Sequence, residues 1–282
     1  MINRREFIGE AMGTFVLVLF GCGAVAVSVL FAAHQGLMQV AAAWGIGVTL
    51  AIYLTRHLSC AHLNPAVSLA MVASGRMSLR KLPLYLMAQF AGAILAGLTL
   101  YALFGPSIAA YENAHGLVRG TAESVKTAMM FGEYYPNPGA AAVVSLPLAM
   151  AAEALGTFLL VLMIFALTEG CNVGRPDNAL APVFIGVTVT SIICLIAPLT
   201  QAGLNPARDL GPRLVAWLMG WGDAAFPDRV GGFFHVYLLA PFAGGILAAL
   251  FFVRVLEPAM KQPSARCACA ADKADSTTGD TQ

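Results

Sequence analysis

Charged residues are scarce in this sequence. Only 11% of its 282 residues are Asp, Glu, Lys or Arg, whereas 59% are hydrophobic. A soluble domain carries roughly 25% charged residues, because its surface must face water. The scarcity of charge therefore excludes a water-soluble globule and predicts a membrane protein. The formal net charge is +1, and we expect no nucleic-acid partner.

The sequence also lacks the residue patterns of disulfide, metal and catalytic sites. Its six cysteines are scattered, without the spacing of a disulfide framework or of a tetrahedral zinc site. It contains no metal-ligand cluster and no matched nucleophile and base. We therefore expect no metal, no cofactor and no enzymatic activity. Cys267 and Cys269 lie in the polar segment 257–282, which we predict to be a disordered cytoplasmic tail.

Long apolar runs, in contrast, are abundant. A helix needs roughly 20 apolar residues to cross the hydrocarbon core of a bilayer. Six segments are suitable: about Phe7–Ala33, Met38–Thr55, Pro83–Phe104, Ser145–Leu167, Leu180–Ala197 and Phe233–Leu256. With six crossings, the basic residues near both termini fall on one side. The positive-inside rule then predicts a multi-pass protein of the cell membrane with both termini in the cytoplasm.

The tripeptide Asn-Pro-Ala occurs twice, in the segments HLNPAVSLA and GLNPARDLG. Its residues are Asn64, Pro65 and Ala66 in the first copy, and Asn205, Pro206 and Ala207 in the second. Asn is a good N-cap and Pro is tolerated at the first helical position, so each copy predicts a helix start. The apolar stretches that follow, Ala66–Ala73 and Ala207–Met219, are too short to cross a bilayer. Two such half-helices, entering from opposite faces, would meet near the midplane.

Other segments recur in the same order. EAMGTF at Glu10 returns as EALGTF at Glu153, IGVT occurs twice, and FAGAILAG at Phe90 returns as FAGGILAA at Phe242. The chain is thus a duplication, with repeats of about residues 6–105 and 149–256. Each repeat holds three crossings and one half-helix, and this odd number turns the second copy upside down. The predicted fold is an all-α inverted repeat of six transmembrane helices and two half-helices.

The meeting point of the half-helices suggests a function. Each helix N-terminus carries roughly half a positive charge, so a cation or hydronium ion would be repelled there. The amides of Asn64 and Asn205 can donate hydrogen bonds to a neutral solute. The backbone carbonyls of Ser59–Leu63 and Thr200–Leu204 can accept them. These features predict a pore for neutral, hydrogen-bonding solutes.

Two acids, Glu10 and Glu153, lie within apolar segments. Acids in such positions often couple transport to ions or protons. Their matching places in the two repeats, and the need of two irregular loops for buried hydrogen-bond partners, favour a structural role as loop anchors.

The segments HLNPAV, GLNPARD, EAMGTF and EALGTF resemble the aquaporin (major intrinsic protein) family over about residues 6–256. The segments YPNP, NPARDLGP and AWLMGWGDAAF are similar to its aquaglyceroporin branch, the bacterial glycerol uptake facilitators. The resemblance implies a homotetramer in membrane lipid, with one pore per subunit. It also implies a selectivity filter at Trp44, Ile193, Ala202 and Arg208. The implied function is a passive channel for glycerol, other small polyols, urea and water.

At two filter positions this chain departs from the glycerol facilitators. Ala202 stands where they have Phe, and Ile193 stands where they have Gly. The resemblance therefore predicts an opening that admits solutes somewhat larger or flatter than glycerol. Two alternatives stay open: a water-selective aquaporin, against which Asp209 weighs, and a coupled secondary transporter, which would need an ion site.

Overall fold

The computed structural model describes residues 3–34, 36–226 and 232–261. Among these residues, six helical segments are long and apolar enough to cross a membrane. They are α1 (Arg4–Phe31), α2 (Leu37–Thr55), η1 with α4 (Leu79–Lys81 and Leu82–Ala114), α6 (Leu146–Thr168), α7 (Ala181–Thr200), and the continuous run η5, α9, η6 and α10 (Phe234–Leu239, Ala240–Phe251, Phe252–Leu256 and Glu257–Lys261). The six predicted crossings are confirmed.

Shorter elements lie between the crossings. The half-helices are α3 (Pro65–Ala73) and α8 (Pro206–Ala216), and each starts at the Pro of an Asn-Pro-Ala copy, as predicted. The remaining elements are η2 (Ala122–Ser124), α5 (Val125–Ala128), η3 (Trp217–Trp221) and η4 (Gly222–Ala225). The last three cover one end of the bundle together with the loop that leads into α6.

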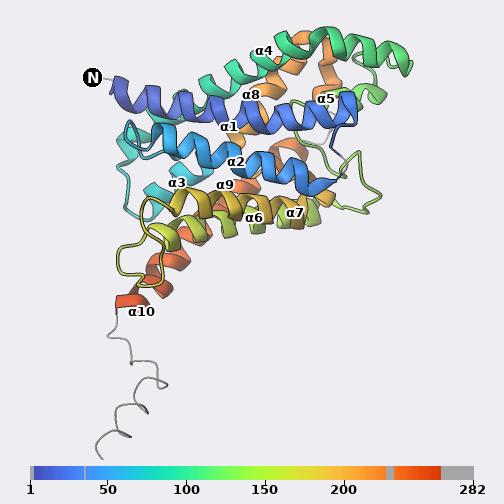
Figure 1. Cartoon of the computed structure of the whole chain (residues 1–282). Coiled ribbons are helices and arrows are strands. Elements are labelled where there is room, and N and C mark those ends of the chain that lie inside the picture. The colour runs from blue at the N-terminus through green and yellow to red at the C-terminus, as the bar shows by residue number, and fades with distance from the viewer. Residues whose placement is uncertain (1–2, 35, 227–231, 262–282) are drawn as a thin grey trace, which may run out of the picture.

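The helices contact one another in two matching sets. In the first set α1 packs on α4, and α4 packs on α8; in the second set α6 packs on α9, and α9 packs on α3. Helices α2 and α7 lie against each other and join the two sets. Each half-helix therefore packs on the last crossing of the other repeat, as the inverted duplication requires. The start of α1 and helix α10 lie at the same end of the bundle (Figure 1).

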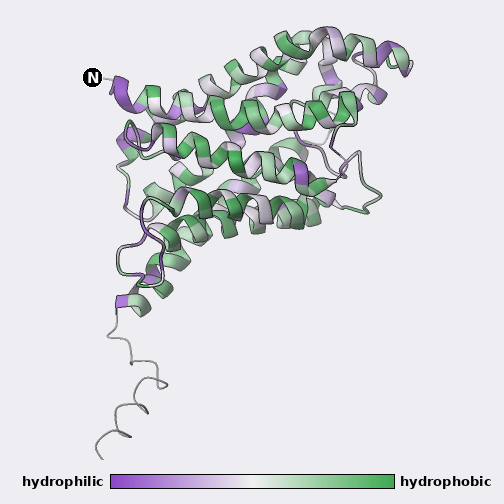
Figure 2. Cartoon of the chain, viewed as in Figure 1, coloured by the Kyte–Doolittle hydropathy of each residue, from purple (hydrophilic) through white to green (hydrophobic). Residues whose placement is uncertain are grey.

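The outside of the bundle is apolar along its length. Figure 2 shows hydrophobic residues along the helices, with hydrophilic residues gathered toward their ends and in the loops. Large apolar side chains are exposed on every crossing; examples are Ile8, Leu54, Leu103, Leu155, Leu195 and Leu247. This surface suits contact with lipid, because hydrocarbon chains replace water around it.

Two segments differ from the predicted boundaries. Helix α4 continues to Ala114, ten residues past the predicted end at Phe104, because its last turns emerge from the apolar zone and the buried Glu112 binds Arg119 there. The predicted disordered tail begins at residue 257, but Glu257–Lys261 form helix α10. Glu257 accepts hydrogen bonds from Arg76 and Lys261. The rest of that tail, 262–282, with Cys267 and Cys269, lies outside the described residues.

Glycines let the paired crossings approach closely at matching places. A Cβ atom on Gly92 of α4 would lie 2.1 Å from the Ala11 carbonyl oxygen of α1. A Cβ atom on Gly244 of α9 would lie 2.1 Å from the Ala154 carbonyl oxygen of α6. Both contacts are with backbone, which cannot swing away. The two halves of the bundle therefore use the same small-residue contact to hold their helices together.

We expect Gly92→Ala to lower the midpoint of thermal unfolding in detergent, because α1 and α4 must move apart by more than side-chain rearrangement allows. The cost should be about 1–3 kcal/mol, as for other overpacked sites. Gly105→Ala on the same helix is the matched control, since no atom lies within 4 Å of its added Cβ. Equal midpoints for the two variants would contradict this account of the helix contact.

Candidate functional site

The two half-helices begin with the same cap. The side-chain oxygen of Asn64 accepts from the backbone N–H of Ala66 at 2.8 Å. That of Asn205 accepts from the N–H groups of Ala207 and Arg208 at 3.1 and 3.2 Å. Both Asn residues have extended backbone and are followed by Pro at the first helical position. The predicted caps are therefore present in both copies.

The two caps also bind each other's loops. The amide nitrogen of Asn64 donates to the Leu204 carbonyl at 3.0 Å, and that of Asn205 donates to the Leu63 carbonyl at 2.8 Å. These reciprocal bonds join the N-terminal ends of α3 and α8, so the two helix dipoles point at one place. Each Asn side-chain amide has a second N–H, which these bonds leave available to a solute.

The loops before both caps have unusual backbone. Ala61 and Leu63 in one loop, and Ala202 and Leu204 in the other, have φ between 49° and 65°. Non-glycine residues rarely adopt this left-handed region, and each costs on the order of 1 kcal/mol. Left-handed residues occur at equivalent positions in the two repeats, so the backbone strain is a shared feature of both loops. Neither the composition nor the spacing of these residues predicted it.

Glu10 and Glu153 each bind one of the loops that precede the Asn caps. Glu10 accepts hydrogen bonds from the backbone N–H groups of His62 and Leu63 at 3.0 and 2.8 Å, and from the side chains of Ser59 and Gln89 at 2.7 and 2.8 Å. Its side chain is fully buried. All four donors are therefore supplied by the protein, which favours the loop-anchor hypothesis over an ion site.

Glu153 makes the equivalent contacts in the second repeat. It accepts from the N–H groups of Gly203 and Leu204 at 2.9 and 2.8 Å, and from the Thr200 hydroxyl at 2.6 Å. Without these acceptors, the buried N–H groups would have no partner in an apolar interior, which costs several kcal/mol each in lipid.

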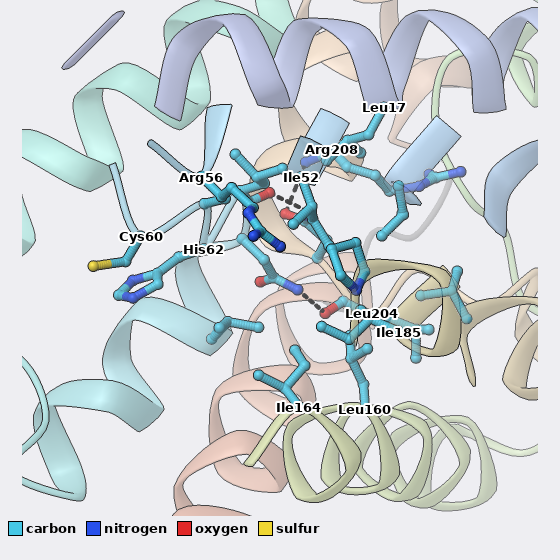
Figure 3. A pocket seen from close by; sticks show the side chains of 18 of the residues that line it. Leu17, Ile52, Arg56, Cys60, His62, Leu160, Ile164, Ile185, Leu204 and Arg208 are labelled. Carbon is cyan, nitrogen blue, oxygen red and sulfur yellow. Dashed lines mark hydrogen bonds between the residues drawn. The ribbon is translucent and has the colours of Figure 1, made fainter. Parts of the chain in front are cut away.

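A chamber of about 530 Å³ opens beside the Asn caps. It is lined by Asn64 and Asn205 and by all four predicted filter residues, namely Trp44, Ile193, Ala202 and Arg208. Apolar side chains form much of the remaining wall, and Figure 3 shows Leu160, Ile164 and Ile185 among them. His62 and Arg56 also line this large chamber. The His62 ring packs on Tyr85, and its Nδ1 atom lies 3.2 Å from the Ser68 hydroxyl.

A second chamber, of about 290 Å³, lies next to the first. Its lining includes the polar residues Ser28, His34, Glu133, Asn137 and Gln201. Trp44 and Ile193 line both chambers, so the large and small chambers meet at these two side chains. Two of the four predicted filter residues thus lie between the chambers, and Ala202 and Arg208 line the large chamber alone.

Arg208 is held at this boundary by two contacts. Its guanidinium carbon lies 4.2 Å from the ring centre of Trp44, and its Nη2 atom forms an ion pair with Glu133. Both partners of the pair are buried. Burial raises the pKa of the Glu133 carboxyl to about 8, and Arg208 opposes this shift. The carboxyl therefore offsets the positive charge of Arg208 only while it is ionised.

A buried Asp209–Arg213 pair lies behind Arg208 on α8. Arg213 donates from Nε and Nη2 to the two carboxylate oxygens of Asp209, at 3.1 and 3.0 Å. Its third guanidinium nitrogen, Nη1, donates to the Ala225 carbonyl at 2.5 Å. The two donors in a fixed fork suit a carboxylate, so the pair keeps both ions satisfied without water.

Sequence reasoning missed Glu133 and Arg213 as parts of the site. The spacing of Asp209 and Arg213, four residues apart on one half-helix, is a signal that could have identified their pair. Glu133 lies in a connecting loop far from Arg208 in the sequence, and nothing in the spacing links them. Among the described residues, no group of three or more His, Cys, Asp or Glu side chains could hold a metal ion.

We expect Glu153→Gln to lower the midpoint of thermal unfolding and the solute flux together. The amide keeps one accepting oxygen but places an NH₂ group against a loop N–H, which leaves a buried donor unpaired at a cost of about 1–3 kcal/mol. Glu123→Gln, at an exposed position, is the matched control for purification and thermal unfolding in detergent. An unchanged midpoint in Glu153→Gln would contradict the anchoring role.

Comparisons with known proteins agree with this geometry. The family model for the major intrinsic proteins matches residues 1–252. A glycerol uptake facilitator protein of Pseudomonas aeruginosa is 40% identical over 245 residues, which cover 86% of each chain. A propanediol uptake facilitator of Citrobacter freundii is 39% identical over 88% of this chain and 91% of that protein. The crystal structure of the aquaglyceroporin from Plasmodium falciparum superimposes with a TM-score of 0.79 at 28% identity, covering 92% of this chain and 98% of that one. This chain belongs to the major intrinsic protein family.

Proposed function

We propose that this protein is a passive membrane channel for glycerol and other small neutral solutes, including polyols and urea, and that it also conducts water. The observation that carries the proposal is the pair of helix N-termini joined through Asn64 and Asn205 in the wall of the large chamber. Relatives that bear the names glycerol uptake facilitator and propanediol uptake facilitator support small polyols as the solutes.

Exclusion of ions follows from the same two helix ends. The dipoles of α3 and α8 place positive potential where the half-helices meet, and the surrounding apolar wall gives little screening. The positive charge of Arg208 adds to this barrier whenever the Glu133 carboxyl is protonated. A neutral solute meets the remaining N–H groups of the two Asn amides instead, and it can pass by exchanging hydrogen bonds.

The two buried acids, Glu10 and Glu153, support passive flow rather than coupled transport. A coupled carrier uses an acid that changes its protonation or its ion during each cycle. Glu10 and Glu153 are fully buried and receive hydrogen bonds from the loops that they support. Releasing them in every cycle would break the loops that hold the Asn caps.

The selectivity filter in this proposal consists of Trp44, Ile193, Ala202 and Arg208. The Trp44 ring gives an apolar face to the carbon backbone of a solute, while Arg208 gives a charged donor on the same side. The small Ala202 side chain leaves space in the lining of the large chamber. We infer that the opening admits solutes somewhat larger than glycerol.

The placement of the protein in the cell is part of the proposal. We infer a multi-pass protein of the cell membrane with repeats at about 6–105 and 149–256. Basic residues on the side that holds the N-terminus and α10 favour the cytoplasm for that side. The small chamber then faces outward. Exposed apolar side chains suit contact with membrane lipid, and the family resemblance favours a homotetramer with one pore in each subunit.

The test is stopped-flow light scattering on proteoliposomes that contain the protein, with protein-free vesicles as the control. Vesicles are mixed with excess glycerol, urea or a larger polyol. We expect rapid shrinkage followed by re-swelling with glycerol, because water leaves first and the solute then enters. Shrinkage without re-swelling for every solute would leave a water-selective channel and contradict the proposal.

We expect Ala202→Phe to lower the flux of a four-carbon or five-carbon polyol more than the flux of glycerol. The added ring fills space opposite the other filter side chains, so the wider solute is excluded first. The flux ratio of glycerol to the larger polyol is the measurement, with Ala141→Phe at an exposed position in the loop before α6 as the control. An unchanged ratio would show that Ala202 does not set the width of the opening.

A further inference from the structure

The ion pair of Glu133 and Arg208 lies where the two chambers meet. Glu133 lines the small chamber, and Arg208 lines the large chamber. Their side chains are only 4% and 5% exposed. A solute that passes from one chamber to the other must therefore pass both groups in succession, in a place that contains little room for screening water.

The backbone of Glu133 is held from both sides by the Asp209–Arg213 pair. Its N–H donates to Asp209 Oδ1 at 2.6 Å, and its carbonyl accepts from Arg213 Nη2. Arg213 in turn is surrounded by aromatic rings at 4.8–5.7 Å from its guanidinium carbon, namely Tyr134, Phe226, Phe233 and Tyr237. A side chain on the preceding residue, Gly132, would meet Arg213 at 2.8 Å. The direction of the Glu133 carboxyl is thus fixed by α8.

Arg208 retains one unused donor beside this carboxyl. Its Nη1 atom is buried and lies 3.9 Å from Asp209 Oδ1, too far for a hydrogen bond, and it has no hydrogen-bond partner within the described part of the chain. A buried donor without a partner is costly unless something else binds it. The boundary therefore presents an acceptor, the Glu133 carboxyl, next to a donor, Arg208 Nη1. The carboxyl keeps an accepting oxygen in either protonation state.

We propose that Glu133 is a specificity-determining residue, which accepts a hydrogen bond from one solute hydroxyl while Arg208 donates to the neighbouring one. Two groups joined in an ion pair match two hydroxyls on adjacent carbons, so the boundary favours vicinal diols over isomers whose hydroxyls are further apart. The inference rests on the proposed function as a polyol channel. A site that forms two hydrogen bonds discriminates against a solute that can form only one.

The test compares 1,2-propanediol with 1,3-propanediol, which have the same atoms and nearly the same size. Flux is measured in proteoliposomes by re-swelling, after subtraction of the flux through protein-free vesicles. We expect the wild type to conduct the 1,2-isomer about tenfold faster, the effect of one hydrogen bond of roughly 1.4 kcal/mol. Glu133→Ala should bring this ratio close to one while water flux continues. Glu123→Ala, in the same connecting segment but exposed, should keep the wild-type ratio.

A purely structural role for Glu133 predicts a different result. If Glu133 only holds Arg208 in place, Glu133→Ala would change the flux of both isomers and of water by one common factor, with the ratio unchanged. That result would overturn the proposal. Glu133→Gln, which keeps the shape and one accepting oxygen, should retain most of the preference for the 1,2-isomer. Glu133→Met, which has a similar length but no accepting oxygen, decides the question if the alanine variant does not fold, because a wild-type ratio in the methionine variant would overturn the proposal.

Flux measurements on the wild-type protein distinguish a failure of the role of Glu133 from a failure of the proposed polyol channel on which that role rests. Flux of both diols and of glycerol, with no preference between the isomers, would overturn the role of Glu133 and leave the polyol channel intact. Absence of all polyol flux, with water flux retained, would overturn the proposed function itself.

Discussion

The structure depends on keeping irregular backbone satisfied at membrane depth. The loops that lead to Asn64 and Asn205 are neither helix nor strand, and they carry residues with positive φ. Lipid cannot accept hydrogen bonds from their N–H groups. Glu10 and Glu153 accept these bonds from inside the bundle. With the loops fixed, each Asn can donate a hydrogen bond to the opposite loop, and the two half-helices can begin side by side inside the bundle.

Most structural features of the pore occur twice because the chain is a duplication. The ion pairs near the filter, in contrast, occur only once. Caps, anchors, strained loops and close glycine contacts occupy matching positions in both repeats. The ion pair of Arg208 and Glu133 belongs to one side only, together with the Asp209–Arg213 pair that holds it. The symmetric part supports the pore and its barrier to ions. The ion pairs that lack a counterpart in the other repeat place charged, hydrogen-bonding groups at one end of the pore only.

Much of this was predictable because the signals are local or periodic. Apolar length predicts the six crossings, and Asn-Pro predicts both half-helix starts. The repeated EAMGTF and EALGTF segments predict the duplication, and the odd number of crossings in each repeat predicts its inversion. The extension of α4 to Ala114 was not predictable from apolarity, because its last turns are polar. Nor was Glu133, since its role comes from tertiary contacts between a loop and a distant half-helix. The four filter positions came from family resemblance, and the structure brings all four to one chamber.

Two fixed helix ends should form a pore that passes neutral solutes without energy coupling. The most direct measurement is the initial rate of glycerol entry into proteoliposomes over a wide range of glycerol concentration, with and without imposed proton and sodium gradients. For a passive pore, we expect a rate that rises linearly with the glycerol gradient and is the same under every ionic gradient. Saturation at low concentration, together with acceleration by a proton or sodium gradient, would contradict it.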